Sequence, residues 1–113
     1  MTTVPKFSQL SLSRQTLIRV MQSVNYGSIL NLMVVDGELS FDPQPEMLVD
    51  IRLDEEVCPR AEMNLSDFSL GVEVRRLLAQ IDALQNGSIE KIVVHGGVPR
   101  RVTLRSSVQQ VHL

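Results

Sequence analysis

Two stretches of the chain place apolar residues at helical spacing, and each leads into an apolar run rich in β-branched residues. The first stripe consists of Leu17, Val20, Met21 and Val24, and the second of Leu77, Leu78, Ile81 and Leu84. Members that lie three or four positions apart are typical of amphipathic helices. The apolar runs 29–35 and 89–94 follow directly and predict strands. The pattern therefore predicts a helix followed by a strand, twice.

The two patterns are related by a constant offset of 60 residues. The tripeptide Gly-Ser-Ile at 27–29 recurs at 87–89, and a turn dipeptide occurs at both 36–37 (Asp-Gly) and 96–97 (Gly-Gly). Each tripeptide begins with a glycine where the helix should end, and each turn dipeptide is of a kind that closes tight hairpins. We interpret the match as duplication of a helix–strand–turn–strand unit. The alternative is that the order helix, glycine, strand, glycine recurs by chance, because glycines commonly end helices and form turns.

These elements predict an α+β fold, with two helices on a mainly antiparallel four- to five-stranded sheet, from a duplicated helix–hairpin unit. The chain should form a single domain, 1–113, with repeat units at about 11–42 and 66–105. Residues 43–65 hold an extra strand, 47–53, and an acidic loop that the second unit lacks. One helix–hairpin unit is too small to be stable alone, so the two units should share one core.

The chain before each predicted helix carries further signals. Residues 1–10 are expected to form a loosely held arm. Ser11 or Ser13 is expected to cap the first helix, because a serine hydroxyl can accept a backbone N–H bond at a helix start. Asn64 or Ser66 should serve the second helix in the same way.

A short motif marks the first unit, and its residues are Tyr26, Gly27, Ser28, Ile29, Asp36 and Gly37. Around it, residues 17–42 resemble a group of very small uncharacterised bacterial proteins of unknown function. These consist of little more than a helix, a Tyr-Gly-Ser-apolar step, a strand, an Asp-Gly turn and a second strand. The second unit departs from this motif, with Asn86 for the tyrosine and Gly96 for the aspartate. The resemblance implies a fold and a bacterial origin, and it carries no activity to transfer.

Composition narrows the class of protein. Apolar residues make up 43% of the chain, with three Phe, one Tyr and no Trp, so the core must be mainly aliphatic. The sequence has no apolar run long enough for a transmembrane helix, and its first residues lack the charged start and apolar stretch of a signal peptide. One cysteine excludes an intrachain disulfide and fits a reducing setting. We therefore expect a cytoplasmic protein.

The net charge of −2 hides a strong segregation of charge. Residues 36–73 contain eleven acidic residues and two arginines. Residues 74–113 contain six basic residues and two acidic ones. Such polarity could steer a partner or pair subunits head to tail. The alternative is that both regions are ordinary solvated surface.

No motif in the sequence supports catalysis, a cofactor or a metal ion. Cys58 is the one possible thiol nucleophile, but its acidic surroundings disfavour the thiolate, and no motif places His95 or His112 beside it. The spacings of known metal sites are missing, and residues 54–56 read as a solvated acidic turn. The glycines at 96–97 lead into a strand, so they do not form a phosphate loop. We therefore expect a protein that is not an enzyme and binds no cofactor; a small enzyme whose catalytic residues are scattered along the sequence is the alternative.

The basic residues of the second hairpin form the best candidate site for contact with a partner or an anion. They are Lys91, His95, Arg100, Arg101 and Arg105. Arg101 and Arg105 alternate with apolar residues on the last strand, so both should lie on the outer face of the sheet. We expect a protein that acts through protein–protein contact, as a homodimer, using this basic face and the acidic segment 50–67. The alternative is a nucleic-acid-binding module, because a helix followed by a basic hairpin resembles the wing of a winged helix.

Overall fold

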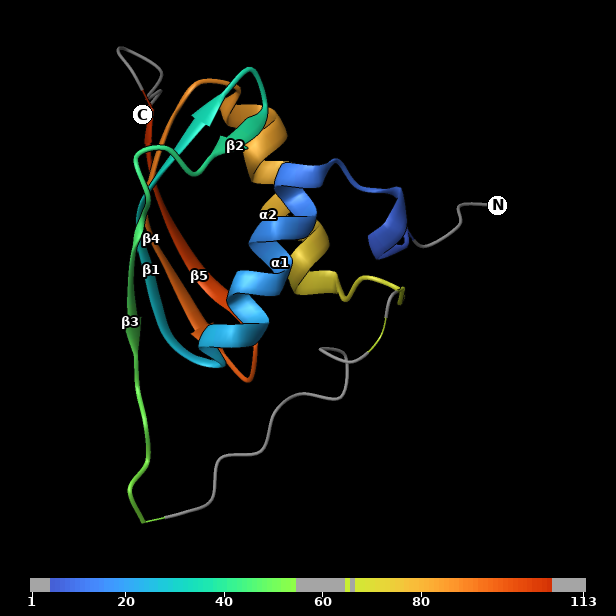
Figure 1. The fold of residues 1–113 in the computed structure, drawn as a ribbon. Helices are drawn as coiled ribbons and strands as arrows, with labels where there is room; N and C mark the ends of the chain where they lie inside the picture. Colours follow the sequence, from blue (N-terminus) through green and yellow to red (C-terminus); the bar gives the residue numbers. More distant parts are fainter. Residues whose placement is uncertain (1–4, 55–64, 66, 107–113) are drawn as a thin grey trace.

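The computed structural model of the chain describes residues 5–54, 65 and 67–106. In chain order, the elements in Figure 1 are η1 (Phe7–Gln9), α1 (Leu12–Val24), β1 (Tyr26–Val35), β2 (Glu38–Ser40), β3 (Glu46–Val49), α2 (Val72–Leu84), β4 (Gly87–His95) and β5 (Val98–Ser106). Most of the acidic loop predicted within 43–65, including Cys58, lies outside the described residues.

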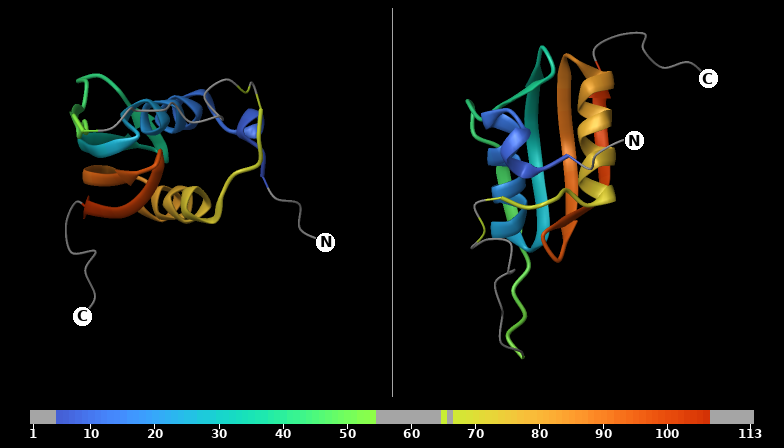
Figure 2. Two further views of the ribbon diagram at one scale, coloured as in Figure 1. Left: turned by 90° about the horizontal axis from the view of Figure 1, so that it is seen from below. Right: turned by 90° about the vertical axis from the view of Figure 1, so that its right-hand side faces the viewer.

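The helices and strands form two layers. The five strands make one sheet in the order β2–β1–β4–β5, and β3 pairs with β1 as well. Every neighbouring pair in this sheet is antiparallel. Figure 2 shows that α1 and α2 lie on the same side of the sheet. The prediction of an α+β fold with two helices on a mainly antiparallel sheet is therefore confirmed.

One aliphatic core fills the space between the two layers. Its most deeply buried side chains come from both helices and both central strands: Leu17, Met21, Ile29, Leu32, Val34, Ile81, Ile89, Ile92 and Val94. The residues of the two predicted helical stripes all belong to this core or pack against it. The helical spacing in the sequence thus identified the buried faces of α1 and α2 correctly.

The two halves of the structure resemble each other at the 60-residue offset seen in the sequence. The residues that follow α1 and α2, Asn25 and Gln85, share an uncommon backbone conformation, with φ of 64° and 60°. The turn of each hairpin donates a backbone hydrogen bond to the residue that follows the helix of the other half. The N–H of Gly37 donates to the carbonyl of Gln85 at 2.8 Å. The N–H of Gly97 donates to the carbonyl of Asn25, also at 2.8 Å.

β2 and β3 together occupy the position that β5 occupies in the other half. β2 pairs with the end of β1 and β3 with its beginning, whereas β5 runs along all of β4. Pro43 and Pro45 lie between β2 and β3, where the missing N–H of proline interrupts a ladder. The strand expected at 47–53 is therefore present as β3, but it corresponds in position to the end of β5 instead of being an addition to the first half. The strand also ends at Val49, earlier than the predicted Leu53, because its partner β1 begins at Tyr26, one residue before the Gly27 that pairs with Val49.

The segment before α1 is docked on the body of the protein. Phe7 is 5% exposed, and its ring stacks on that of Phe68 with 4.9 Å between centroids. The N–H of Phe7 donates to the carbonyl of Phe68 at 2.8 Å. The guanidinium of Arg19 lies 4.4 Å from the centre of the Phe7 ring. The expectation of a loosely held arm is therefore wrong for residues 5–10, because an aromatic side chain anchors them.

The chain before α2 stays extended for longer than the sequence indicated. Lys6 and Ser69 form an antiparallel bridge, which pairs this segment with the N-terminal one. Gly71 is the N-cap residue of α2, and no side chain caps the helix there. The second helix therefore begins later than predicted. Asn64 and Ser66, the expected capping residues, lie outside the described residues.

The serines at the start of α1 bind β2 instead of capping the helix. Ser11 is the N-cap residue, but its side chain makes no capping hydrogen bond. The hydroxyl of Ser11 donates to the carboxylate of Glu38 at 2.7 Å, and the hydroxyl of Ser13 donates to the same oxygen. The capping prediction for these serines is therefore wrong. The hydrogen bonds from Ser13 and Ser11 lower the pKa of the Glu38 carboxyl.

Replacing Glu38 by glutamine is expected to make the free energy of unfolding depend less on pH in the acid range. The pKa of this carboxyl in the folded protein lies below its ordinary value of 4.5. The ionised form therefore stabilises the fold above that pH, and its contribution is lost as the pH falls through the lower folded value. Wild type should lose more free energy of unfolding than Glu38→Gln between about pH 5 and about pH 2.

Urea denaturation at a series of pH values measures both curves. Asp42→Asn is the control, because Asp42 is an exposed carboxyl in the same region and its side chain has no described hydrogen bond or ion pair. Its curve should follow that of the wild type. Parallel curves for wild type and Glu38→Gln would show that the two serine hydrogen bonds contribute no pH-dependent stability.

Candidate functional site

The sheet has one face that no described helix covers, and we call it the open face. Six large apolar residues lie on it among the serines Ser28 and Ser88, and we call them its apolar centre: Tyr26, Leu30, Met33, Val35, Leu48 and Val93. Tyr26, Met33, Val35 and Leu48 are 40–53% exposed. Leu30 and Val93 are half-buried, but neither belongs to the core nor packs against it. Large apolar side chains therefore lie on the solvent side of the two central strands.

The backbone of β1 explains why its apolar residues fall on both faces. Asn31 has a φ of 60°, a left-handed value that asparagine tolerates better than most residues. The alternation of the strand shifts phase there. As a result, the buried residues on either side of Asn31 are Ile29 and Leu32, and Leu30 and Met33 lie on the open face.

β5 places two of the predicted arginines on the open face. Arg101 and Arg105 are exposed, whereas Val102 and Leu104 are half-buried and pack against the core. This alternation is the one that the sequence predicted. Arg105 makes an ion pair with Glu90 on the neighbouring strand. Arg101 makes no ion pair within the described part of the chain.

Two predicted residues of β4 extend this basic region. Lys91 is exposed and lies opposite Leu30 of β1. His95 is exposed and lies opposite Tyr26, with 6.1 Å between the centres of the two rings. We call the set of Lys91, His95, Arg101 and Arg105 the basic side of the open face.

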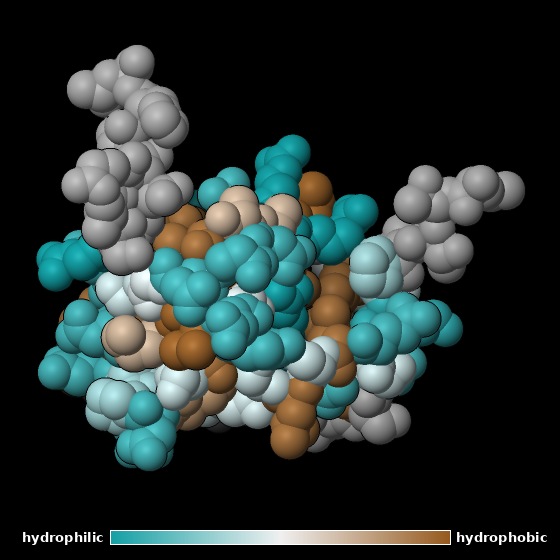
Figure 3. All heavy atoms as spheres, turned by 90° about the horizontal axis from the view of Figure 1, so that it is seen from above, coloured by the Kyte–Doolittle hydropathy of each residue, from teal (hydrophilic) through white to brown (hydrophobic). Residues whose placement is uncertain are grey.

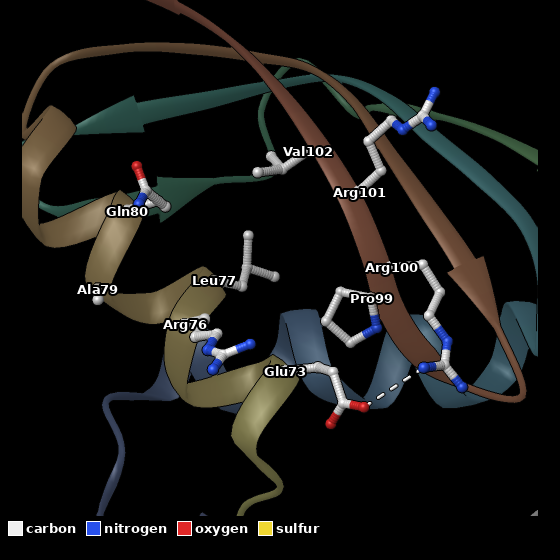
Figure 4. A pocket seen from close by; sticks show the side chains of 9 residues that line it. All are labelled: Glu73, Arg76, Leu77, Ala79, Gln80, Pro99, Arg100, Arg101 and Val102. Carbon is white, nitrogen blue, oxygen red and sulfur yellow. Dashed lines mark hydrogen bonds and ion pairs between the residues drawn. The ribbon is translucent and has the colours of Figure 1, made fainter.

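Arg100, the fifth predicted residue, is directed away from the open face. A bulge in the β4–β5 ladder leaves Arg100 without an opposite residue, and a bulge commonly re-aims the side chain it carries. The guanidinium of Arg100 lies 3.4 Å from the carboxylate of Glu73 on α2. Figure 4 shows this pair at a groove of about 310 Å³ between α2 and β5, with Arg76 beside it and Arg101 pointing elsewhere. The five basic residues therefore do not form a single anion-binding cluster.

The opposite edge of the open face is acidic. Glu46 of β3 lies opposite Leu30. The N–H of Asp50 donates to the carbonyl of Tyr26 at 2.7 Å, so the pairing continues one residue beyond the strand. Alternation along this edge puts the side chains of Glu46 and Asp50 on the open face, and we call them its acidic side. Residues 55–64 and 66 of the predicted acidic surface 50–67 lie outside the described residues.

The apolar centre was missed by the sequence reasoning, although the sequence carries a signal for it. Residues 32–35 are all apolar, where a strand with one solvated face would alternate. A strand that is apolar on both faces predicts cover on both faces. In this structure the helices cover one of them. The run therefore predicts a second cover, which the described residues do not provide.

Other kinds of site find little support in the described part of the chain. It holds no group of three or more His, Cys, Asp or Glu side chains that could bind a metal ion. Cys58 and His112 lie outside it. None of its helices combines the length and the apolar character needed to cross a membrane. The end of the molecule drawn in Figure 3 carries hydrophobic residues only in separate groups among hydrophilic ones.

The open face thus combines an apolar centre with a basic and an acidic side. A surface of this composition suits contact with another macromolecule, because apolar groups supply contact area and charges set orientation. Comparison of the chain with family models, with curated protein sequences and with solved structures finds no significant match.

Proposed function

We propose that this chain is a small, non-enzymatic cytoplasmic protein that works through protein–protein contact, and that it forms a homodimer through the open face. The observation that carries the proposal is the apolar centre of that face. Antiparallel sheets often leave one face to water, but that face then carries mainly polar residues. Here Tyr26, Met33 and Val35 are about half exposed on it. A second open face would cover them.

The size of the open face indicates a weak dimer. Four strand positions at a spacing of about 4.8 Å, each about 30 Å long, give a face on the order of 500 Å². Two stacked faces would then remove on the order of 1,000 Å² from water, the lower limit for a specific interface. We therefore expect a dissociation constant of about micromolar order.

We also propose that the two halves arose by duplication of one helix–hairpin unit. The 60-residue offset relates the bounds of α1 and α2 and the conformations of Asn25 and Gln85. It also relates the crossed hydrogen bonds of Gly37 and Gly97. If the two halves had separate origins, all three similarities would have to arise by coincidence. A shared origin accounts for them together.

Nucleic-acid binding is the second candidate, and the ion pairs weaken it. Glu90 and Glu73 partly neutralise Arg105 and Arg100, and Arg100 lies on the other side of β5. A nucleic-acid surface needs unpaired cations that converge on phosphates. Anisotropy titrations of labelled DNA and RNA at low and at physiological salt test this candidate. Saturable binding that weakens steeply with salt would favour it over the homodimer.

Met33→Glu is expected to raise the dissociation constant of the homodimer by about tenfold or more, because it places a charge in the apolar centre of the interface. Val72→Glu is the matched control, since Val72 is exposed to a similar extent, 42% against 40%, but lies on α2. Sedimentation equilibrium from micromolar to millimolar protein measures both variants. The expected wild-type species has twice the mass of the 12.7 kDa chain. A wild type that stays monomeric over the whole range would refute the proposed homodimer.

A further inference from the structure

We infer that two copies stack their open faces about a two-fold axis parallel to the strands, so that the basic side of each copy lies over the acidic side of the other. The inference rests on the proposed function, because it specifies how the second copy is oriented. The residues that meet would be Lys91 and Arg101 of one copy and Glu46 and Asp50 of the other.

The charges are separated across the strands of the open face. One row of the register runs from Thr103 and Lys91 at the basic side to Glu46 at the acidic side. The neighbouring row begins with Arg101 and ends with Leu48. Positive charge therefore collects on β4 and β5, and negative charge on β3. A face with this distribution of charge has a preferred orientation against a copy of itself.

Two simple orientations stack the open faces with two-fold symmetry. An axis perpendicular to the strands would place β5 over the partner's β5 and β3 over the partner's β3. Like charges would then meet at both edges, which is destabilising. An axis parallel to the strands exchanges the edges, so β5 lies over the partner's β3 and β4 over the partner's β1. Such a contact is self-complementary and closes as a dimer, with strands nearly aligned as in β-sandwiches.

The register of the rows identifies the pairs in this second orientation. Arg101 would lie over the partner's Leu48, between the partner's Glu46 and the partner's Asp50, which occupy the rows on either side. Lys91 would lie over the partner's Leu30, beside the partner's Glu46. Neither Lys91 nor Arg101 makes an ion pair within the described part of its own chain. Both cations are therefore available for a partner.

Charge neutralisation tests the inferred axis. Lys91→Gln combined with Arg101→Gln is expected to raise the dissociation constant of the homodimer by about tenfold, because it removes attraction at both edges. With the axis perpendicular to the strands the same variant would bind more tightly, because it would relieve repulsion. Arg75→Gln combined with Arg76→Gln is the control, since it removes the same charge from exposed positions on α2. It should leave the dissociation constant unchanged.

Charge reversal provides the second arm of the test. Lys91→Glu with Arg101→Glu should dissociate the dimer, and Glu46→Lys with Asp50→Lys should do the same. A chain that carries all four substitutions should recover the wild-type dissociation constant within about threefold, because each edge again meets its opposite. Circular dichroism and urea denaturation of every variant confirm that loss of the dimer is not loss of the fold.

The outcomes separate the inference from the proposed function. A wild type that is monomeric at every concentration overturns both. A wild type that dimerises, with the Gln variants unchanged or tighter, overturns the axis and leaves the homodimer in place. Weakening by both reversed pairs together with recovery in the fourfold variant supports the axis parallel to the strands.

Discussion

Replacing Gly27 by alanine is expected to lower the free energy of unfolding by about 2–4 kcal/mol, because the added methyl group has no room. It would lie 1.9 Å from the carbonyl oxygen of Leu48 and 2.9 Å from the carbonyl carbon. Both atoms belong to the backbone of β3, so relief requires β3 to move away from β1. The φ of Gly27 is also 154°, a value that side-chain-bearing residues rarely adopt.

Urea denaturation of Gly27→Ala measures this loss, and two other glycines give the comparison. Gly87→Ala should cost less, because its methyl group would lie 2.6 Å from the carbonyl oxygen of Arg105. Gly71→Ala should cost less than about 1 kcal/mol, since it is the N-cap of α2 and the nearest atom lies 3.5 Å away. A Gly27→Ala protein as stable as Gly71→Ala would show that β3 does not pair closely with β1.

Phe7→Ala is expected to destabilise the protein by about 3 kcal/mol, the lower end of the range for a buried phenylalanine. The change removes the stack with Phe68 and the surface that Arg19 covers. It also weakens the link between the N-terminal segment and the chain before α2, because the stacked rings no longer shield the backbone hydrogen bond from Phe7 to Phe68. Chemical denaturation followed by circular dichroism measures the change in free energy.

Leu12→Ala is the control for this prediction, since Leu12 lies close by in the sequence but is 80% exposed. Its effect should stay within about 0.5 kcal/mol. If the N-terminal segment were loosely held, Phe7→Ala would change the free energy of unfolding as little as Leu12→Ala. That result would contradict the docking seen in the structure.

Local patterns in the sequence predicted the helices, the strands and the faces they bury. Apolar residues repeat every 3.6 positions on the buried face of a helix and every 2 positions on that of a strand. They could not predict the docking of Phe7 on Phe68, which joins residues distant in sequence. The correspondence between β3 and the end of β5 could not be seen in the sequence for a related reason. Ser28 lies opposite Leu48 and Ser88 opposite Arg105, so these partners are 57 residues apart instead of 60. A comparison without gaps does not reveal that pairing.

The candidate site was predictable in part. Alternation on β5 placed Arg101 and Arg105 correctly, because strand periodicity survives wherever pairing is regular. It made no prediction about the direction of Arg100, because a bulge leaves no signature in the spacing of apolar residues. The acidic side could not be predicted from composition alone, because only the register shows that Glu46 lies in the same row as Lys91.

The crossed hydrogen bonds of the two hairpin turns bear on how this chain folds. The turn amide of Gly37 is satisfied by Gln85, and that of Gly97 by Asn25, so each half lacks a bond until the other arrives. Both contacts join residues far apart in the chain, and closing such loops costs entropy before any contact repays it. Helix formation is fast by comparison. We therefore expect the meeting of the two halves, and not the formation of either one, to set the folding rate, and we expect a newly synthesised first half to complete its hydrogen bonds only when the second half is available.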